Sequence, residues 1–451
     1  MEEKPPMQRE LRSLAKKYYR KHRILAQWLL LFLLGSWMIF SDPFGVGSAS
    51  ERASETAFYR LTAKHYDAQK SQPNILVVLF NDRSIDNLYP TLLESNDWPL
   101  SYLDQVNLLS TIMTHSPSAL FYDVMWVKQR SLDESYERAV SKLKLVQEKT
   151  QVPLFFARGV ADSKLDEHVE EQLSEFTTLV VNGWEAREDL YPLYSQGAET
   201  TATALYRTYC ESAGCQPPES NSLPVSVRWS AKAAPVLLEH RKQECEVTDP
   251  SIFGAVWNGG EYLLQNTIPG LNTPEVDQLC PPHRVLFADE LMVLARSPNE
   301  DDRIKLKKWI EDSIVLVGGH IEGIHDYVIS PVHGALPGVF FHAMALDNLM
   351  VYEDEYIRDD PNAKLINLII WMVYISLLLV VRNVSDQFSK LYWLKNSTKL
   401  FSVAYVAIVI GIVFGVLHLS PSNWISILAL GWLGNKLIER LDKAHLRQEA
   451  D

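Results

Sequence analysis

Three long stretches without a charged side chain constrain this chain more than any other feature. Residues 24–41 read ILAQWLLLFLLGSWMIFS, residues 365–381 read LINLIIWMVYISLLLVV, and residues 400–419 read LFSVAYVAIVIGIVFGVLHL. Each stretch is about as long as a helix that crosses the hydrocarbon core of a bilayer, and a helix rich in Leu, Ile, Val and Phe inserts favourably. The sequence therefore predicts a membrane protein.

A fourth apolar segment and the basic residues set the predicted topology. Residues 424–434 (WISILALGWLG) form a shorter segment that either spans the membrane, by continuing through Leu437 and Ile438, or lies at its surface. Residues 1–23 carry eight Lys or Arg against three Glu, and residues 382–399 carry four against one Asp. Because positive flanks stay in the cytoplasm, both regions and the tail are placed inside. Because both ends of the chain then lie on the same side of the membrane, the number of crossings must be even. Four membrane helices meet this condition and three do not.

This topology places one large exported domain between the first and second membrane helices, in a multi-pass protein of the bacterial inner membrane. The exported domain would lie in the periplasm, and the lipid bilayer would be the first partner. A signal peptide is the alternative for residues 1–41, although Ser41-Asp42-Pro43-Phe44 is a poor cleavage site. The predicted segments are the cytoplasmic N-terminus 1–23, membrane helix 24–41, exported domain 42–363, membrane helix 364–381, cytoplasmic loop 382–399, membrane helices 400–419 and 420–438, and cytoplasmic tail 439–451.

The exported section is acidic and holds every cysteine. The chain has a formal net charge of −13, and the middle is more acidic still because basic residues gather near the ends, which argues against nucleic acid as a partner. In an oxidising compartment one or two disulfides are expected. Among the three possible pairings we favour Cys210–Cys215, which closes a tight loop, together with Cys245–Cys280. Without a C-x-x-C motif we expect neither a metal nor a cofactor.

Short apolar runs in this section predict an α/β domain with a mostly parallel sheet flanked by helices. Uninterrupted apolar runs that alternate with helical stretches are typical of strands buried on both faces. Residues 51–72 are predicted to form a helix next to the membrane, and residues 185–300 an irregular elaboration of the same domain. The predicted strands are residues 75–80, 119–124, 153–157, 179–181 and 314–317, and the helices between them are residues 99–115 and 131–150.

Five features in a fixed order resemble a known family. They are an apolar run ending at Asp82-Arg83-Ser84-Ile85, the pair Trp98-Pro99, FYDVMW with Asp123, SIVLVGGHIEGIHDYVISPV with Gly318, Asp326 and Pro331, and PGVFFHAMALDNL with Gly338, His342, Ala343 and Asn348. Together they resemble the second class of CHASE domain, an extracellular sensory domain found on bacterial cyclases and histidine kinases. The resemblance implies a sensor.

The chain departs from that family in two respects. Residues Gly319-His320-Ile321-Glu322 stand where small residues are usual, so a ligand contact made there would differ. The predicted cytoplasmic segments are also too short for the cyclase or kinase domain that usually follows. We therefore expect a separate cytoplasmic or membrane signalling partner.

The candidate ligand-binding residues are Asp82, Asp123, Asp326 and Gly318. Each carboxylate follows or borders a predicted strand, and strand ends in α/β sheets line a crevice where ligands bind. Such carboxylates could receive a cation or the amines and hydroxyls of a small solute. The alternative is that they cap helices or accept hydrogen bonds from turn amides. Gly318-Gly319 is expected to form a tight turn, because it lacks the residues of a phosphate-binding loop.

Histidines and glycines raise two further alternatives. The side chains of His320, His325, His333 and His342 lie close in the sequence and suggest a metal site or a pH sensor, although their spacing matches no ligand motif. Gly411 and Gly415 form a G-x-x-x-G pair in the third membrane segment, which either permits close helix packing or arises by chance.

The favoured hypothesis is a sensor or receptor subunit, not an enzyme, because the chain carries none of the catalytic motifs sought. It would detect a small solute or envelope signal and relay the change through its membrane helices to the separate partner. A homodimer is expected, since a relay needs packed helix sets that shift. The alternative is a membrane effector whose helices assemble to perturb the bilayer in response to an intracellular signal.

Overall fold

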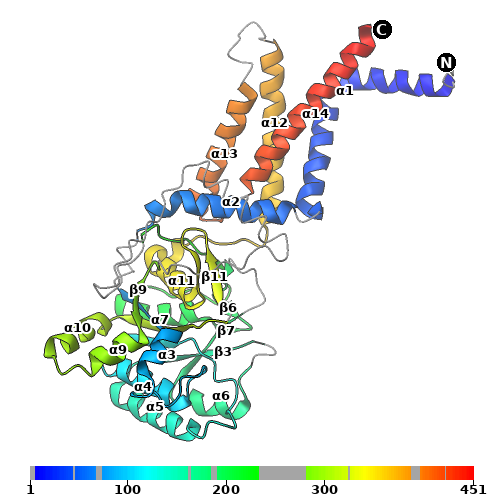
Figure 1. The fold of residues 1–451 in the computed structure, drawn as a ribbon. Coiled ribbons are helices and arrows are strands. Elements are labelled where there is room, and N and C mark those ends of the chain that lie inside the picture. Colours follow the sequence, from blue (N-terminus) through cyan, green and yellow to red (C-terminus); the bar gives the residue numbers. More distant parts are fainter. Residues whose placement is uncertain are drawn as a thin grey trace. The chain divides into compact units, whose positions relative to one another are not determined.

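The computed structural model describes residues 6–43, 46–67, 74–160, 164–183, 190–232, 281–323, 326–387, 397–421 and 423–450. The chain divides into two compact units (Figure 1). We call the first the helical unit; its described residues extend to Phe58 and resume at Asp360. The second is the α/β unit, whose described residues run from Tyr59 to Asp359.

A six-stranded sheet forms the centre of the α/β unit, and all its strands are parallel. The order across the sheet is β4-β3-β2-β10-β1-β9. The strands are β1 (Ile75–Asn81), β2 (Ala119–Tyr122), β3 (Leu154–Arg158), β4 (Thr178–Val181), β9 (Arg284–Phe287) and β10 (Ile314–His320). The predicted α/β class is confirmed. All five predicted strands are present, and β9 was missed because it lies within residues 185–300, which were predicted to be irregular.

Helices cover both faces of this sheet. Along β1, Leu76, Val78 and Phe80 belong to one hydrophobic cluster, whereas Ile75 and Val77 belong to the other, as strand periodicity requires. The second face carries α7 (Thr201–Ala213) and α11 (Val339–Tyr352). The helices on the first face are α3 (Asp82–Leu88), α4 (Tyr102–Met113), α5 (Tyr136–Thr150), α6 (Glu167–Ser174), α9 (Ala288–Ala295) and α10 (Glu300–Ile310).

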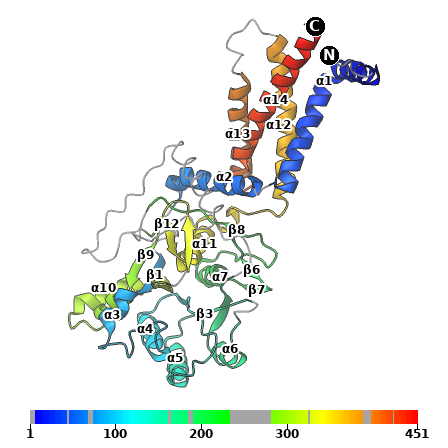
Figure 2. The same cartoon turned by 45° about the vertical axis from the view of Figure 1, so that its right-hand side comes forward.

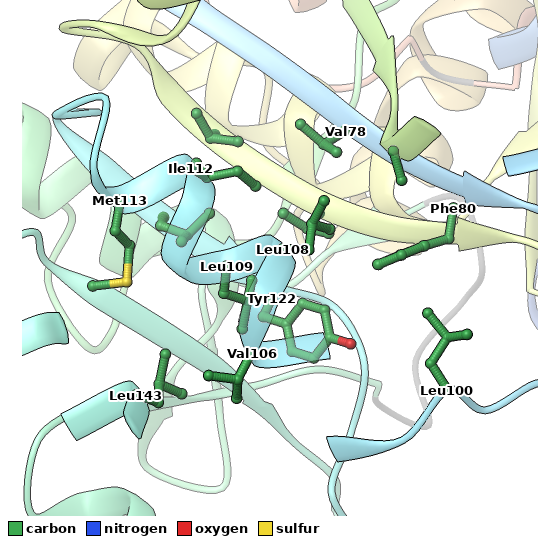
Figure 3. Packing of buried hydrophobic residues seen from close by; sticks show 14 of the residues in the cluster. Val78, Phe80, Leu100, Val106, Leu108, Leu109, Ile112, Met113, Tyr122 and Leu143 are labelled. Atoms are coloured by element: carbon green, nitrogen blue, oxygen red, sulfur yellow. The ribbon is translucent and has the colours of Figure 1, made fainter. Parts of the chain in front are cut away.

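The packing of α4 illustrates how the first face is stabilised. Val106, Leu109 and Ile112 are fully buried and belong to the same cluster as Val78 and Tyr122 of the sheet (Figure 3). Full burial of one such side chain contributes on the order of 1.5 to 3 kcal/mol. These residues, three positions apart in the sequence, form the face of α4 that packs on the sheet.

The ends of the predicted helices needed correction. Helix α4 begins at Tyr102 and not at Pro99, because the side chain of Ser101 accepts a hydrogen bond from the backbone N–H of Asp104 at 3.1 Å. Helix α5 begins at Tyr136, later than the predicted residue 131. The helix predicted over residues 51–72 is α2 (Val46–Thr62), followed by a short 3-10 turn.

Three short antiparallel pairs and one disulfide complete the described part of the α/β unit. The disulfide joins Cys210 to Cys215 at the end of α7, as predicted. Cys245 and Cys280 lie outside the described residues, so their pairing stays a prediction. The short pairs are β5 (Leu190–Tyr191) with β8 (Val225–Ser226), β6 (Tyr194–Ser195) with β7 (Ala198–Glu199), and β11 (Tyr327–Ser330) with β12 (Gly334–Pro337).

The described helices of the helical unit are α1 (Pro6–Ser41), α2, α12 (Ala363–Gln387), α13 (Ser397–Gly415) and α14 (Trp424–Ala450). By length and composition, two described segments are long and apolar enough to cross a membrane, Arg23–Ser41 and Ala363–Arg382. The apolar part of α13, Lys399–Gly415, is shorter. Two of the four predicted membrane helices therefore contain a segment that is long and apolar enough to span a membrane. The four crossings remain a proposal.

Glycines allow α1, α12 and α14 to approach closely. A Cβ atom at Gly35 would lie 2.0 Å from Nε1 of Trp371, and one at Gly431 would lie 2.1 Å from the hydroxyl oxygen of Tyr374. In contrast, a Cβ at Gly411 or Gly415 would meet no atom within 4 Å. Within the described chain, the predicted G-x-x-x-G pair is therefore not the packing position, and glycines on α1 and α14 fill that role.

Helix α2 lies across one end of the helix group in both views (Figures 1 and 2). The side chain of Asn423, just before α14, donates a hydrogen bond to the carbonyl oxygen of Gly47 at 2.9 Å. The indole of Trp424 donates to the carbonyl of Ser54 at 3.1 Å, and Ser420 donates to Glu55 at 2.7 Å. These bonds fix α2 to the segment between α13 and α14 and to the first residue of α14.

Candidate ligand site

Polar side chains gather where β2 and β4 end and where α11 begins. Asp123 directly follows β2, and Asn182 directly follows β4. Because parallel strands end at the same edge of a sheet, the two side chains meet although β3 lies between their strands. His342, from the first turns of α11, reaches the same place.

A continuous path of hydrogen bonds joins these groups. The amide nitrogen of Asn182 donates to Oδ1 of Asp123. Its amide oxygen lies 3.0 Å from Nε2 of His342, and Nδ1 of the same ring lies 2.8 Å from the hydroxyl of Tyr191. That hydroxyl in turn accepts the backbone N–H of Ala202 at 2.9 Å, at the start of α7. The path therefore links a carboxylate at a strand end to two helices.

The charge of Asp123 fixes the direction of every hydrogen bond in this path. An ionised carboxylate only accepts, so Asn182 must turn its amide nitrogen toward Asp123 and its oxygen toward His342. His342 then carries its hydrogen on Nε2, and its Nδ1 accepts from Tyr191. A protonated Asp123 could instead donate, which would reverse the path. Burial lowers the pKa of His342 to about 3, so the ring is neutral and can serve in either direction.

Two carboxylates share this site without a compensating cation. The side chain of Asp123 is 3 % exposed. Burial raises the pKa of the Asp123 carboxyl well above its ordinary value, and the nearby Asp326 carboxylate raises it further, while the hydrogen bond from Asn182 opposes the shift. Removal of water also raises the pKa of Asp326. In the part of the chain that the structure describes, no Lys or Arg forms an ion pair with either group.

Asp326 lies against the start of α11. Its carbonyl oxygen accepts the backbone N–H of Gly338 at 2.9 Å. A Cβ atom at Gly338 would lie 2.2 Å from Oδ1 of Asp326, so only glycine leaves room for the carboxylate there. The position suits an acidic group, because the N-terminus of a helix carries partial positive charge.

Asp82 has a different role from the other two aspartates. It is exposed, and its Oδ2 accepts the backbone N–H of Glu322 at 2.9 Å, which holds the turn after β10. Among the described residues, Asp82 forms no hydrogen bond with Asp123 or Asp326. Its position thus matches the structural alternative, in which a strand-end carboxylate binds a turn amide.

Gly318 also has a structural role, and the predicted glycine turn was wrong. Gly318 and Gly319 both lie within β10, where they pair with Leu79 and Phe80 of β1. A Cβ at Gly318 would lie 2.6 Å from Cβ of Val339, so the glycine allows α11 to approach the sheet. We therefore assign Gly318 to packing, next to the carboxylate site.

The histidines of this region do not converge. His342 belongs to the path described above, whereas His333 binds the carbonyl of Ser230 through Nε2 at 2.7 Å. Burial lowers the pKa of His320, and Asp82 opposes that shift. His325 lies outside the described residues. Among those that are described, no three His, Cys, Asp or Glu side chains are grouped so that they could hold a metal ion.

A second buried polar cluster lies near the other end of α11. Nε2 of His283 lies 2.9 Å from Oδ2 of Asp347, and the hydroxyl of Tyr66 donates to Oδ1 at 3.0 Å. The side chains of His283 and Asp347 are both 0 % exposed. The neighbouring Asn348 exchanges two hydrogen bonds with the backbone of Arg228. Every residue of α11 from Val339 to Val351 is buried, so these groups are enclosed by protein.

Sequence reasoning missed several residues of these clusters, among them Asn182, Tyr191 and His283. Asn182 follows a predicted strand, so the same rule that selected Asp123 could have selected it. Tyr191 and His283 lie in the region without regular periodicity, and no local signal marks them.

A comparison with models of protein families gives a match over most of the chain. The model of the CHASE2 domain matches residues 29–381 of this chain. The chain belongs to the CHASE2 domain family. No curated protein and no solved structure matches it.

The CHASE2 match extends over most of both apolar segments with membrane-spanning length and over all the residues of the carboxylate site. CHASE2 domains are extracellular sensory domains, so the resemblance inferred from the five sequence features is confirmed. The family places the chain among sensors and does not specify a ligand.

Proposed function

We propose that this CHASE2 protein is a membrane-anchored extracytoplasmic sensor whose α/β unit binds a small cation or amine at Asp123 and Asp326. The observation that carries the proposal is the pair of neighbouring carboxylates whose pKa values are both raised. Such a pair is costly for the folded protein by itself, because the buried carboxylate of Asp123 and the nearby carboxylate of Asp326 repel each other. A cationic ligand would remove that cost.

The proposed placement has the α/β unit in the periplasm of a bacterium and the helical unit in the inner membrane. Basic residues flank the apolar segments at the N-terminus and between α12 and α13, which favours the cytoplasm for both. We propose four crossings, formed by α1, α12, α13 and α14. The disulfide between Cys210 and Cys215 suits an oxidising compartment.

The proposed relay begins at Asp123 and ends in the membrane. Neutralising Asp123 would change the direction of the hydrogen bonds through Asn182 to His342, which belongs to α11. The chain continues from the end of α11 at Tyr352 to α12, which begins at Ala363. We propose that a homodimer of this chain passes the resulting shift of α12 to a separate cytoplasmic signalling partner.

Ligand-dependent thermal unfolding of the full chain in mild detergent tests the binding step. The probes are Ca²⁺, Mg²⁺, ethanolamine and putrescine, each compared with choline as a bulky cation without N–H donors. We expect at least one probe to raise the melting temperature of the wild type and to have no such effect on Asp123→Asn.

Asp82→Asn is the matched control, because Asp82 also follows a strand of the same sheet but binds a turn amide. It should keep the ligand-dependent shift. The absence of a shift with any probe, or an undiminished shift in Asp123→Asn, would contradict binding of a cation at this site.

A further inference from the structure

A cavity in the helical unit is separate from the carboxylate site. It is formed by α1, α2, α12 and α14 and has an empty volume of about 720 Å³, which includes the part open to solvent. Its apolar wall contains Met38 and Ile39 from α1, Trp371 from α12, and Ile427 and Leu430 from α14.

The opposite wall of the cavity is polar and charged. Asp42, Glu51 and Lys364 line it, which gives two carboxylates and one ammonium group. Asp42 is held in place by the backbone N–H groups of Gly47 and Ser48 at the start of α2. The charged groups of the lining therefore have a net charge of one negative unit at neutral pH.

One lining atom requires a partner. Oδ1 of Asn367 is buried and accepts no hydrogen bond from any residue that the structure describes. Leaving a buried polar atom without a hydrogen bond is costly, so such an atom calls for an explanation. Because Asn367 lines the cavity, an occupant with an N–H or O–H donor would satisfy it.

The cavity lies where the two apolar segments end. Asp42 directly follows the segment Arg23–Ser41, and Lys364 lies at the start of the segment Ala363–Arg382. Under the membrane placement proposed above, on which this step rests, the polar wall lies at headgroup level and the apolar wall at the level of the upper acyl chains.

We infer that this cavity binds one zwitterionic aminophospholipid, with the headgroup against Asp42, Glu51, Lys364 and Asn367 and the upper part of an acyl chain against Met38 and Leu430. The primary ammonium of an ethanolamine headgroup has three N–H donors for the two carboxylates and Asn367. Lys364 complements the phosphate as a point charge. An anionic headgroup without an amine would bring no positive charge of its own to the two carboxylates.

Such a lipid would contact the four helices that meet at the extracytoplasmic membrane surface. Helix α2 is fixed to the start of α14 through Asn423 and Trp424. Helices α1 and α12 are joined by the hydrogen bond from the indole of Trp371 to the carbonyl of Leu31 at 3.1 Å. The lipid would therefore act as a structural ligand at the junction of these helices.

Native mass spectrometry of the full chain, released from mild detergent after exchange with defined lipids, tests the proposal. Phosphatidylethanolamine and phosphatidylglycerol with identical acyl chains are offered at equal concentration. We expect the wild type to retain one phosphatidylethanolamine per chain, and Asn367→Leu to weaken its retention roughly tenfold, since a hydrogen bond to a charged group is lost. Leu430→Trp, which fills the cavity from its apolar side, should abolish retention.

Ser36→Ala is the matched control, because Oγ of Ser36 is likewise buried without a hydrogen-bond partner among the described residues but does not line the cavity. It should retain the lipid as the wild type does. Circular dichroism establishes that each variant is folded. Equal retention of the two lipids by the wild type, retention by folded Leu430→Trp, or equally tight binding of soluble glycerophosphoethanolamine would overturn the proposal. None of these results depends on Asp123, so the sensing proposal is tested separately.

Discussion

A buried aspartate side chain lies near each end of α11, but the two side chains have different kinds of partner. Asp347 accepts hydrogen bonds from Tyr66 and binds His283, and both members of that pair are fully buried. Asp123 has an amide as its partner and faces a second carboxylate, Asp326. The first cluster is organised for stability. We propose that the second lowers the stability of the fold, as ligand sites commonly do.

Removing Asp347 should have the largest effect. Asp347→Ala leaves His283 and the hydroxyl of Tyr66 buried without their partner, which we expect to lower the free energy of unfolding by about 3 to 5 kcal/mol. Thermal and urea unfolding of the full chain in mild detergent, followed by circular dichroism, measures this loss. A loss below about 1 kcal/mol would remove the distinction between the two ends of the helix.

Crowding α11 against the sheet should have an intermediate effect. Gly318→Ala places a Cβ atom 2.6 Å from Val339, and overpacking of this kind costs about 1 to 3 kcal/mol. Gly319→Ala is the matched control, because the nearest atom to its Cβ, on the side chain of Trp98, is 3.7 Å away. The same unfolding measurement should give a much smaller loss for Gly319→Ala. Equal losses would mean that close packing of α11 does not explain Gly318.

Neutralising Asp123 should stabilise the protein. Asp123→Asn keeps an acceptor for Asn182 but removes the repulsion between Asp123 and Asp326. We expect the free energy of unfolding at pH 8 to rise by about 1.4 kcal/mol for each unit by which the pKa of Asp123 is raised in the folded state. Destabilisation at this pH, with binding of the probes retained, would show that the carboxylate is structural.

The gain in stability from Asp123→Asn should depend on pH with a definite sign. A raised folded-state pKa means that the folded wild type binds the proton more tightly than the unfolded chain. Its contribution to stability is therefore complete below the ordinary carboxyl pKa, about 3.9, and is lost as the pH rises through the folded pKa. The difference between variant and wild type should vanish near pH 3 and grow as the pH increases. Unfolding curves at a series of pH values measure this difference, and a constant difference would contradict the raised pKa.

Protonation of His342 should lower the free energy of unfolding as the pH falls, in the wild type and in Asp123→Asn alike. Burial lowers its pKa to about 3, so the folded protein resists protonation of the ring. Stability from this source is present above the ordinary histidine pKa of about 6.5 and is lost as the pH falls toward about 3. In Asp123→Asn the loss in acid should be steeper than in the wild type, because the protonation of Asp123 no longer offsets it.

Local pattern predicted the sheet well and the site only in part. The run Ile75–Phe80 is apolar throughout because β1 is covered on both faces, so its sequence alone identified it. Strand β9 is short and lies within an irregular region, so no pattern distinguished it. Asp123 was found from its place at a strand end. The partners Tyr191 and His342 come together only through tertiary packing, which sequence spacing does not record.

The roles of the glycines could not be predicted from the local sequence either. A Gly-Gly pair favours turns by intrinsic preference. Gly318 nevertheless lies within strand β10, where the absence of a side chain lets α11 approach closely. In the helical unit the pair Gly411 and Gly415 fits a packing motif, but the close contacts are made at Gly35 and Gly431. In both cases the partner across the contact determines the role, and that partner is distant in sequence.

Proton release during ligand binding tests the sensing account most directly. The cation or amine probe that raises the melting temperature is titrated calorimetrically into the full chain at pH 6, in two buffers of different ionisation enthalpy. If the ligand replaces protons held by Asp123 and Asp326, the wild type should release protons and Asp123→Asn should bind weakly or not at all. Tight binding without proton release, unchanged in Asp123→Asn, would contradict the account.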